Sequence, residues 1–241
     1  MLSRDDLIQT LRERMRQGTT RLAAERISSG CVGLDRLLPA QGFRRGSLVE
    51  WVGLPGSGAT TLALVAAREA SRNGGAVVVV DPLRRFYPPA AASLGIELEK
   101  LILVRPGNPR DQQWALTQTL GCRAVAAVLC WPERLESRVG RRWQLAAEQG
   151  GSLGLLVSRP RGDEGNAWSE MRLRVEGLPT SGWRRWRVEV LRSRTPGEMC
   201  RPNGRSIELE LAEEGLIHEA HPLHLAPELA PATLRRRRAQ A

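Results

Sequence analysis

The chain has 241 residues, of which 41% are hydrophobic, and a formal net charge of +10. This length allows one larger α/β domain with a core of its own and excludes a small disulfide-stapled scaffold. The charge favours an acidic partner, with nucleic acid first and a membrane surface second. Of the 36 basic residues only Lys100 is lysine, a bias that a GC-rich genome would also produce without any ligand.

The cysteines and the hydropathy indicate the cellular compartment in which the protein is expected. Four cysteines stand singly and the chain has three His, so zinc ligands in paired spacing are excluded. We interpret the cysteines as reduced and mostly buried thiols. Neither a signal peptide nor a run of about 18 apolar residues is present, which predicts a cytoplasmic protein without membrane contact.

Residues 1–26 predict one helix, with Ser3 as its N-cap and acidic residues in its first turn. Its apolar stripe is narrow and consists of Leu7, Leu11, Met15 and Leu22. A polar helix with such a stripe either packs on its own domain or mediates self-association. Both alternatives stay open at this point.

The central signal of the sequence is the segment from Gly53 to Thr61, between an apolar run and a predicted helix. It matches the phosphate-binding pattern G-x-x-x-x-G-K-[ST] except that Ala59 replaces the lysine. The backbone N–H cradle and the Thr60 hydroxyl remain, but the point charge is lost. A nucleotide, if one binds weakly, would contact Gly53, Gly56, Ser57, Gly58, Thr60 and Thr61.

Buried strands and helices alternate after this loop. Apolar runs without alternation at 76–80, 101–104, 124–129 and 153–157 are typical of strands covered on both faces. Helices are predicted from Thr60 to about Arg72, from Asp111 to Gly121, and from Trp131 to Gly150. Short connections between them indicate right-handed crossovers and a mostly parallel α/β sheet with helices on both faces.

The pattern changes after residue 160. Apolar and charged residues alternate at 171–176, 183–191 and 205–211, which predicts an antiparallel extension with one wet face. From residue 226 prolines and four consecutive arginines predict a basic, disordered tail. The expected organisation is therefore a helix (1–26), a core (27–225) and a tail (226–241).

Arginine is concentrated in the alternating strands. Residues 172–205 hold nine Arg against three acids, whereas residues 206–230 hold six acids and no Arg. Arginines beside an aromatic ring suit single-stranded DNA, although a solvated sheet face is the alternative. The predicted DNA or partner contacts are Arg172, Arg174, Trp183, Arg184, Arg185, Arg187, Arg192 and Arg194. The alternation along the strand places Trp186 in the core. In the helix before residue 150, we interpret the arginines as a solvated face rather than a binding strip; they are Arg134, Arg138, Arg141 and Arg142.

The order of these signatures resembles the RecA family. The resemblance is carried by Ile27–Gly30 with Leu34-Asp35, the Gly42–Gly46 turn, Val49-Glu50 and the P-loop, and more weakly by Val80-Asp81, Leu94–Ile96 and Gly165–Ala167. It covers residues 27–210 and implies a RecA-like fold. It also places Arg192 and Arg194 where RecA relatives carry lysines that reach a neighbour's nucleotide.

Three catalytic features of that family are absent. The P-loop lysine is Ala59, the water-activating acid falls at Leu83 or Arg84, and the Mg²⁺-binding aspartate position reads Cys130-Trp131. Losing one lysine–phosphate contact, worth roughly 1.5–3 kcal/mol, weakens a nucleotide by about ten- to a hundredfold. We therefore expect a pseudo-ATPase with no catalytic residue and no metal site, with weak ATP/Mg binding left open.

Length, degeneracy and the Arg- and Trp-rich end make the chain similar to the ImuA family of RecA-related accessory proteins. That resemblance implies a role in damage-induced (SOS) translesion DNA synthesis. The implied partners are ImuB, which is a Y-family polymerase relative, and an error-prone DNA polymerase. Single-stranded DNA is a further possible partner, on the evidence of the arginine-rich strands. Two alternatives stay open: a DNA-stimulated ATPase with an unconventional site, and a RecA-like regulator of cell division.

Overall fold

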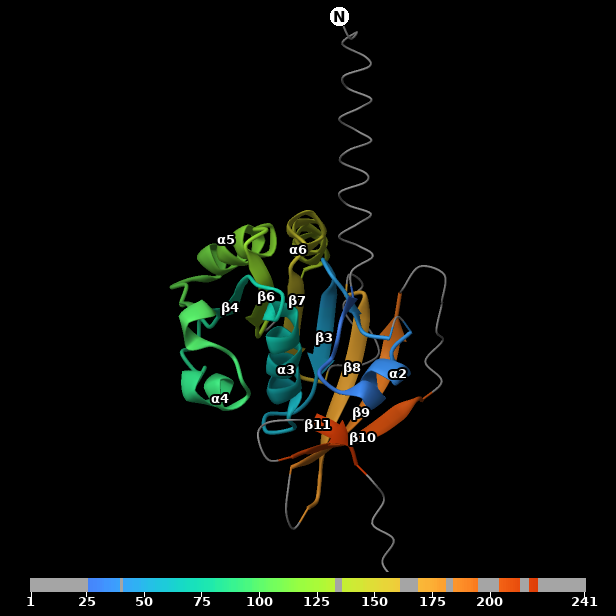
Figure 1. Ribbon diagram of the computed structural model, residues 1–241. Coiled ribbons are helices and arrows are strands. Elements are labelled where there is room, and N and C mark those ends of the chain that lie inside the picture. The colour runs from blue at the N-terminus through green and yellow to red at the C-terminus, as the bar shows by residue number, and fades with distance from the viewer. Residues whose placement is uncertain are drawn as a thin grey trace, which may run out of the picture.

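A nine-stranded sheet forms the body of the molecule in the computed structural model (Figure 1). The structure describes residues 26–39, 41–132, 136–160, 169–180, 184–194, 204–212 and 217–220. The strand order is β11-β10-β9-β8-β3-β7-β6-β4-β5, with a separate two-stranded sheet of β1 and β2. The N-terminal helix and the basic tail that the sequence predicts lie outside the described residues.

The five strands at one end of the sheet are parallel. They are β3 (Leu48–Val52), β7 (Leu153–Ser158), β6 (Val125–Cys130), β4 (Ala76–Val80) and β5 (Leu101–Val104). Every residue of β3 and β6 is buried. The prediction of strands covered on both faces is confirmed for β4, β6 and β7, because uninterrupted apolar runs can be accommodated between two layers of helices. It is wrong for β5, which is the edge strand of the sheet and leaves Ile102 50% exposed.

Helices cover both faces of these parallel strands. The helix α3 (Ala59–Ser71) packs on the face that carries Val49 and Trp51, and α5 (Pro109–Leu120) and α6 (Ser137–Gly150) pack on the face that carries Leu48. Neighbouring residues of one strand thus belong to different core clusters, as the twofold alternation of a strand requires. Figure 1 shows α5 and α6 side by side. Three short helices complete the set: α2 (Val32–Leu37), α4 (Pro88–Ser93) and the 3-10 turn η1 (Leu98–Lys100).

The second half of the sheet is partly antiparallel. β8 (Met171–Leu178) runs parallel to β3, and β9 (Arg185–Ser193), β10 (Ser206–Leu211) and β11 (Ile217–Glu219) follow in antiparallel order. The antiparallel extension is confirmed except at its first strand. β8 was expected within the extension, but it joins the parallel part beside β3. The short strand β11 was not predicted.

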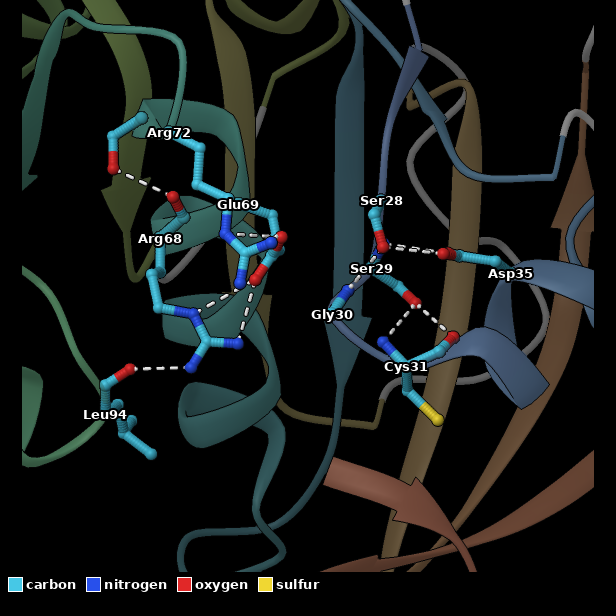
Figure 2. Close-up of polar contacts among 10 residues, drawn as sticks. Ser28, Ser29, Gly30, Cys31, Asp35, Arg68, Glu69, Arg72 and Leu94 are labelled. Carbon is cyan, nitrogen blue, oxygen red and sulfur yellow. Dashed lines mark hydrogen bonds and ion pairs between the residues drawn. The ribbon is translucent and has the colours of Figure 1, made fainter. Parts of the chain in front are cut away.

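The lead-in to the sheet is a compact turn. β1 (Arg26–Ile27) pairs with β2 (Phe43–Arg44), so Arg26 belongs to a strand and not to the predicted helix. Between them the Asp35 carboxylate accepts hydrogen bonds from the Ser28 hydroxyl (2.6 Å) and the Ser29 N–H (2.7 Å), as Figure 2 shows. These bonds satisfy the backbone where α2 begins.

Two helix starts differ from the prediction. α6 begins at Ser137, with Glu136 as its N-cap, and not at Trp131. The N-cap of α5 is Asn108, whose side chain accepts from the Asp111 N–H at 2.9 Å, while its amide donates to the Asp111 carboxylate at 2.7 Å. The helix was expected to begin at Asp111, but it begins at Pro109, a residue that is favoured at the first helical position. Within the described part of the chain, no helix combines the length and apolarity needed to cross a bilayer.

Candidate functional site

The P-loop turn predicted from the sequence is present between β3 and α3. Gly56 (φ 84°) and Gly58 (φ 93°) adopt the left-handed region that favours glycine. The Ser57 N–H donates to the Leu54 carbonyl at 2.9 Å and closes the turn, and the Leu62 N–H donates to the Gly58 carbonyl at 3.0 Å at the start of α3. The N-terminus of α3 therefore faces the loop.

A tryptophan from β9 lies against this loop. A Cβ atom on Gly58 would lie 1.9 Å from the indole Nε1 of Trp186, so only glycine fits there. Trp186 is 2% exposed, which confirms that it belongs to the core. The loop is thus held by packing against the antiparallel part of the sheet.

The residue at the position of the missing lysine is buried in the core. Ala59 is 3% exposed and belongs to the core cluster of the α3 face. The chain's single lysine, Lys100, forms an ion pair with Glu97 at 2.7 Å and lines a cavity with Arg72, which follows the C-terminal end of α3. No lysine replaces the lost charge at the loop.

The hydroxyl that would bind Mg²⁺ in an intact loop is engaged by an indole. Trp131 Nε1 donates to Thr60 Oγ1 at 3.3 Å, and the Trp131 ring packs against Phe86 with ring centroids 6.3 Å apart. A cation needs a lone pair of this oxygen, and the indole N–H is a donor directed at the same oxygen. The Trp131 indole therefore competes with Mg²⁺ for the Thr60 oxygen.

The acidic positions offer no replacement. Asp81 is 1% exposed, and its carboxylate accepts the backbone N–H groups of Arg85 (3.1 Å) and Phe86 (2.9 Å). Leu83, at the position of the water-activating acid, is exposed and has no titratable group. At the strand end where the metal-binding aspartate is expected, Trp131 is the residue that reaches Thr60, and Cys130 packs in the core on the α5/α6 face, where complete burial raises the pKa of its thiol to about 12. A thiol with such a pKa is neutral near pH 7 and is no ligand for Mg²⁺.

The residues present do not fit a nucleotide–Mg²⁺ complex. The loop retains backbone N–H groups and a helix N-terminus. The lysine is absent, and so are the metal-binding aspartate and the water-activating acid that would face the loop. Among the residues that the structure describes, no group of three or more His, Cys, Asp or Glu side chains is arranged to hold a metal ion.

The arginines of the wet sheet face are paired with glutamates. Arg174 contacts Glu189 at 3.1 Å, and Arg187 contacts Glu208 at 2.9 Å. Arg185 lies 3.5 Å from Glu208, and the register pairs it with Glu210. Glu189 lies within the arginine-rich segment, and Glu208 and Glu210 come from the segment that follows it in the sequence. Strand order places the two segments side by side and interleaves their charges.

Two of the predicted contact arginines are partly or wholly covered. Arg172 is 8% exposed and lies 3.4 Å from Glu50, which accepts from the Ser158 hydroxyl at 2.7 Å. This is a correction, because Arg172 offers no surface to DNA or a partner. Arg192 donates to Ser169 Oγ at 2.9 Å, and desolvation, reinforced by nearby guanidinium groups, lowers its pKa.

The remaining contact predictions are divided between exposed and undescribed positions. Arg184 and Arg194 are exposed at the two ends of β9, and Trp183 lies outside the described residues. The hydrogen bond from Trp131 to Thr60 was not predicted from the sequence. The signal was present as an indole directly after the expected aspartate position.

The fold and the loop define a RecA-like α/β protein. Residues 12–127 match the family model of the RecA N-terminal domain. It is similar to "Protein RecA" of Rhodopirellula baltica (32% identity over 109 residues, 45% of this chain and 29% of that protein). It is also similar to "Protein RecA" of Bartonella bacilliformis (40% over 96 residues, 40% of this chain and 27% of that protein).

A solved structure shares the fold over a larger part of the chain. The structure titled "Crystal structure of the RadB recombinase" superposes with a TM-score of 0.65 at 21% identity, covering 81% of this chain and 100% of that one. The two RecA alignments span 29% and 27% of those proteins, less than a third of their length. The RecA-like fold that the sequence predicts is confirmed.

Proposed function

We propose that this chain is a non-catalytic RecA-fold adaptor that supports damage-induced translesion DNA synthesis, as ImuA proteins do. Its partners would be an ImuB-like Y-family polymerase relative, an error-prone DNA polymerase and single-stranded DNA. The relatives named for RecA support a role in DNA repair. The degenerate loop supports the ImuA-like assignment.

The observation that carries the proposal is the hydrogen bond from Trp131 to Thr60. An ATPase needs that hydroxyl, a carboxylate and a lysine to hold Mg²⁺ and the outer phosphates. Here the Thr60 hydroxyl accepts a hydrogen bond from the Trp131 indole, Cys130 and Trp131 stand where the carboxylate is expected, and the methyl group of Ala59 replaces the lysine. Energy for DNA transactions would therefore have to come from a partner, which suits an adaptor.

The loss of nucleotide chemistry is tested by turnover. With ATP, Mg²⁺ and single-stranded DNA, the full chain is expected to hydrolyse far less than about one ATP per second. Titration with a fluorescent ATP analogue should give no affinity tighter than about 100 µM. Turnover near one per second, or tighter binding, would favour the DNA-stimulated ATPase instead.

The adaptor role is tested by capture of the partner. The tagged full chain is incubated with extracts of DNA-damaged and undamaged cells, and retained proteins are identified. A Y-family polymerase relative that is retained from damaged cells is the expected result. Recovery of a cell-division protein in its place would overturn the proposal. Repeating the capture without residues 1–25 or without 221–241 would assign the contact to one end of the chain.

A further inference from the structure

The outer face of α6 carries an exposed stripe of arginines. Arg138, Arg141 and Arg142 are exposed, together with Leu145, whereas Trp143 on the opposite side is 2% exposed. Separations of three and four residues place the arginines on one side of a helix. We call Arg138, Arg141 and Arg142 the α6 stripe.

The charges of the α6 stripe have no acidic partner among the described residues. Arg141 donates to the neutral amide oxygen of Gln144 at 2.8 Å, and neither Arg138 nor Arg142 makes an ion pair with a described side chain. The described acid within α6, Glu148, is engaged by Gln144 at 3.0 Å. On the sheet face, by contrast, Arg174, Arg185 and Arg187 all face glutamates.

The stripe is electrostatically unfavourable in the isolated chain. Like charges at i,i+3 and i,i+4 repel each other on a helix surface. Arg138 also lies in the first turn, where the helix dipole favours an acid and disfavours a cation, and that turn contains no acid. A row of anions along the stripe would relieve both costs at once.

We propose that the α6 stripe binds the phosphate backbone of single-stranded DNA. Guanidinium groups pair with phosphate oxygens in a bidentate manner, and Arg138 and Arg142 are separated by about 6 Å along the helix axis. Leu145 is the apolar member of this face and reads no base edge, so binding is independent of sequence. The inference rests on the DNA contact of the proposed function and moves its site from β9 to α6.

The experiment measures binding of fluorescein-labelled dT20 by anisotropy at 50 and 200 mM NaCl. Three phosphate contacts at about 0.7 ions each predict that the wild-type affinity falls about 20-fold over this range. The variant R138Q/R141Q/R142Q keeps the helix propensity of arginine. It should lose at least about tenfold in affinity at 50 mM NaCl and most of the salt dependence.

Two further variants make the result specific. R174Q/R185Q/R187Q removes the same charge from the sheet face and should stay within about twofold of the wild type, because those arginines are already paired. R138K/R141K/R142K keeps the charge and should retain most of the affinity. If R138Q/R141Q/R142Q and R174Q/R185Q/R187Q lost the same affinity, the effect would be one of net charge alone, and the α6 stripe would not be the DNA-binding site.

Other outcomes also contradict the inference. The first is that the wild type does not bind dT20 at 50 mM NaCl, and the second is that R138Q/R141Q/R142Q binds dT20 as tightly as the wild type. The third is that poly-glutamate of equal charge displaces dT20. The last would assign the stripe to an acidic protein. If DNA binding fails but the polymerase relative is still captured from damaged cells, the inference falls and the proposed function stands.

Discussion

Trp131 and Trp186 hold the P-loop from two sides. Trp131 donates to the Thr60 hydroxyl, and Trp186 lies against Gly58. In an intact loop these two positions face a metal ion and a phosphate, both of which leave when the nucleotide leaves. Here they face side chains of the chain itself. The glycines are therefore retained for packing and backbone conformation, with no need for a ligand.

Gly56 and Gly58 both have a positive φ, so substituting each of them separates the contributions of packing and of backbone strain to stability. Gly56→Ala should cost about 1 kcal/mol, because φ is 84° but no atom lies within 4 Å of the new Cβ. Gly58→Ala adds a clash with Trp186 to a similar strain and should cost roughly 2–5 kcal/mol. Urea unfolding followed by far-UV circular dichroism measures both. Equal losses would show that Trp186 does not restrict the loop.

At the scale of elements, the strands β8, β9 and β10 form a ladder of alternating charge. The register aligns Glu176, Arg187 and Glu208 in one row, and Arg174 with Glu189 in the next. Opposite charges directly across antiparallel strands stabilise a sheet and like charges destabilise it. The half-exposed pairs are individually weak, so their value lies in fixing the register of strands that have one wet face.

Reversal of the central charge tests the ladder. Arg187→Glu would stand between Glu176 and Glu208, while Arg187→Gln removes the charge without adding repulsion. We expect Arg187→Glu to be about 1 kcal/mol less stable than Arg187→Gln at low salt. Since about 1 M NaCl screens exposed charges beyond roughly 3 Å, the difference should shrink there. Urea unfolding at both salt concentrations gives the result, and a salt-independent difference would contradict an electrostatic ladder.

The ladder also explains where sequence reasoning succeeded and failed. The alternation of β9 placed Trp186 and Val188 in the core correctly, because burial in a strand follows a period of two. The net charge of the same face was misjudged, because the glutamates of β10 lie in a later segment. Which strands become neighbours depends on topology and register, and neither is local. Trp131 was missed for the same reason, since its partner Thr60 is 71 residues away.

At the scale of the whole molecule, the loop lies at the centre of the fold. β3 lies between β7 and β8 in the sheet, and α3 shares one core cluster with β3 and with Trp186 of β9. Since the described strands β3–β11 form one sheet, a ligand bound at the loop would stabilise the cooperative unit as a whole. Thermal unfolding therefore reports on the loop without any assumption about activity.

The melting temperature of the full chain should not change with ATP and Mg²⁺. A ligand at about 1 mM with a Kd of about 100 µM would add about 1.4 kcal/mol, or roughly 3 °C, to a protein of this size. Ala59→Lys restores the charge but leaves Thr60 engaged by Trp131 and the Cys130 thiol neutral, so any shift with ATP should not depend on Mg²⁺. Adding Trp131→Asp should make the shift depend on Mg²⁺, because this change frees the Thr60 hydroxyl and places a carboxylate on the side of β6 from which Trp131 reaches it. A wild-type shift of about 3 °C or more with ATP and Mg²⁺ would show that the loop still binds nucleotide.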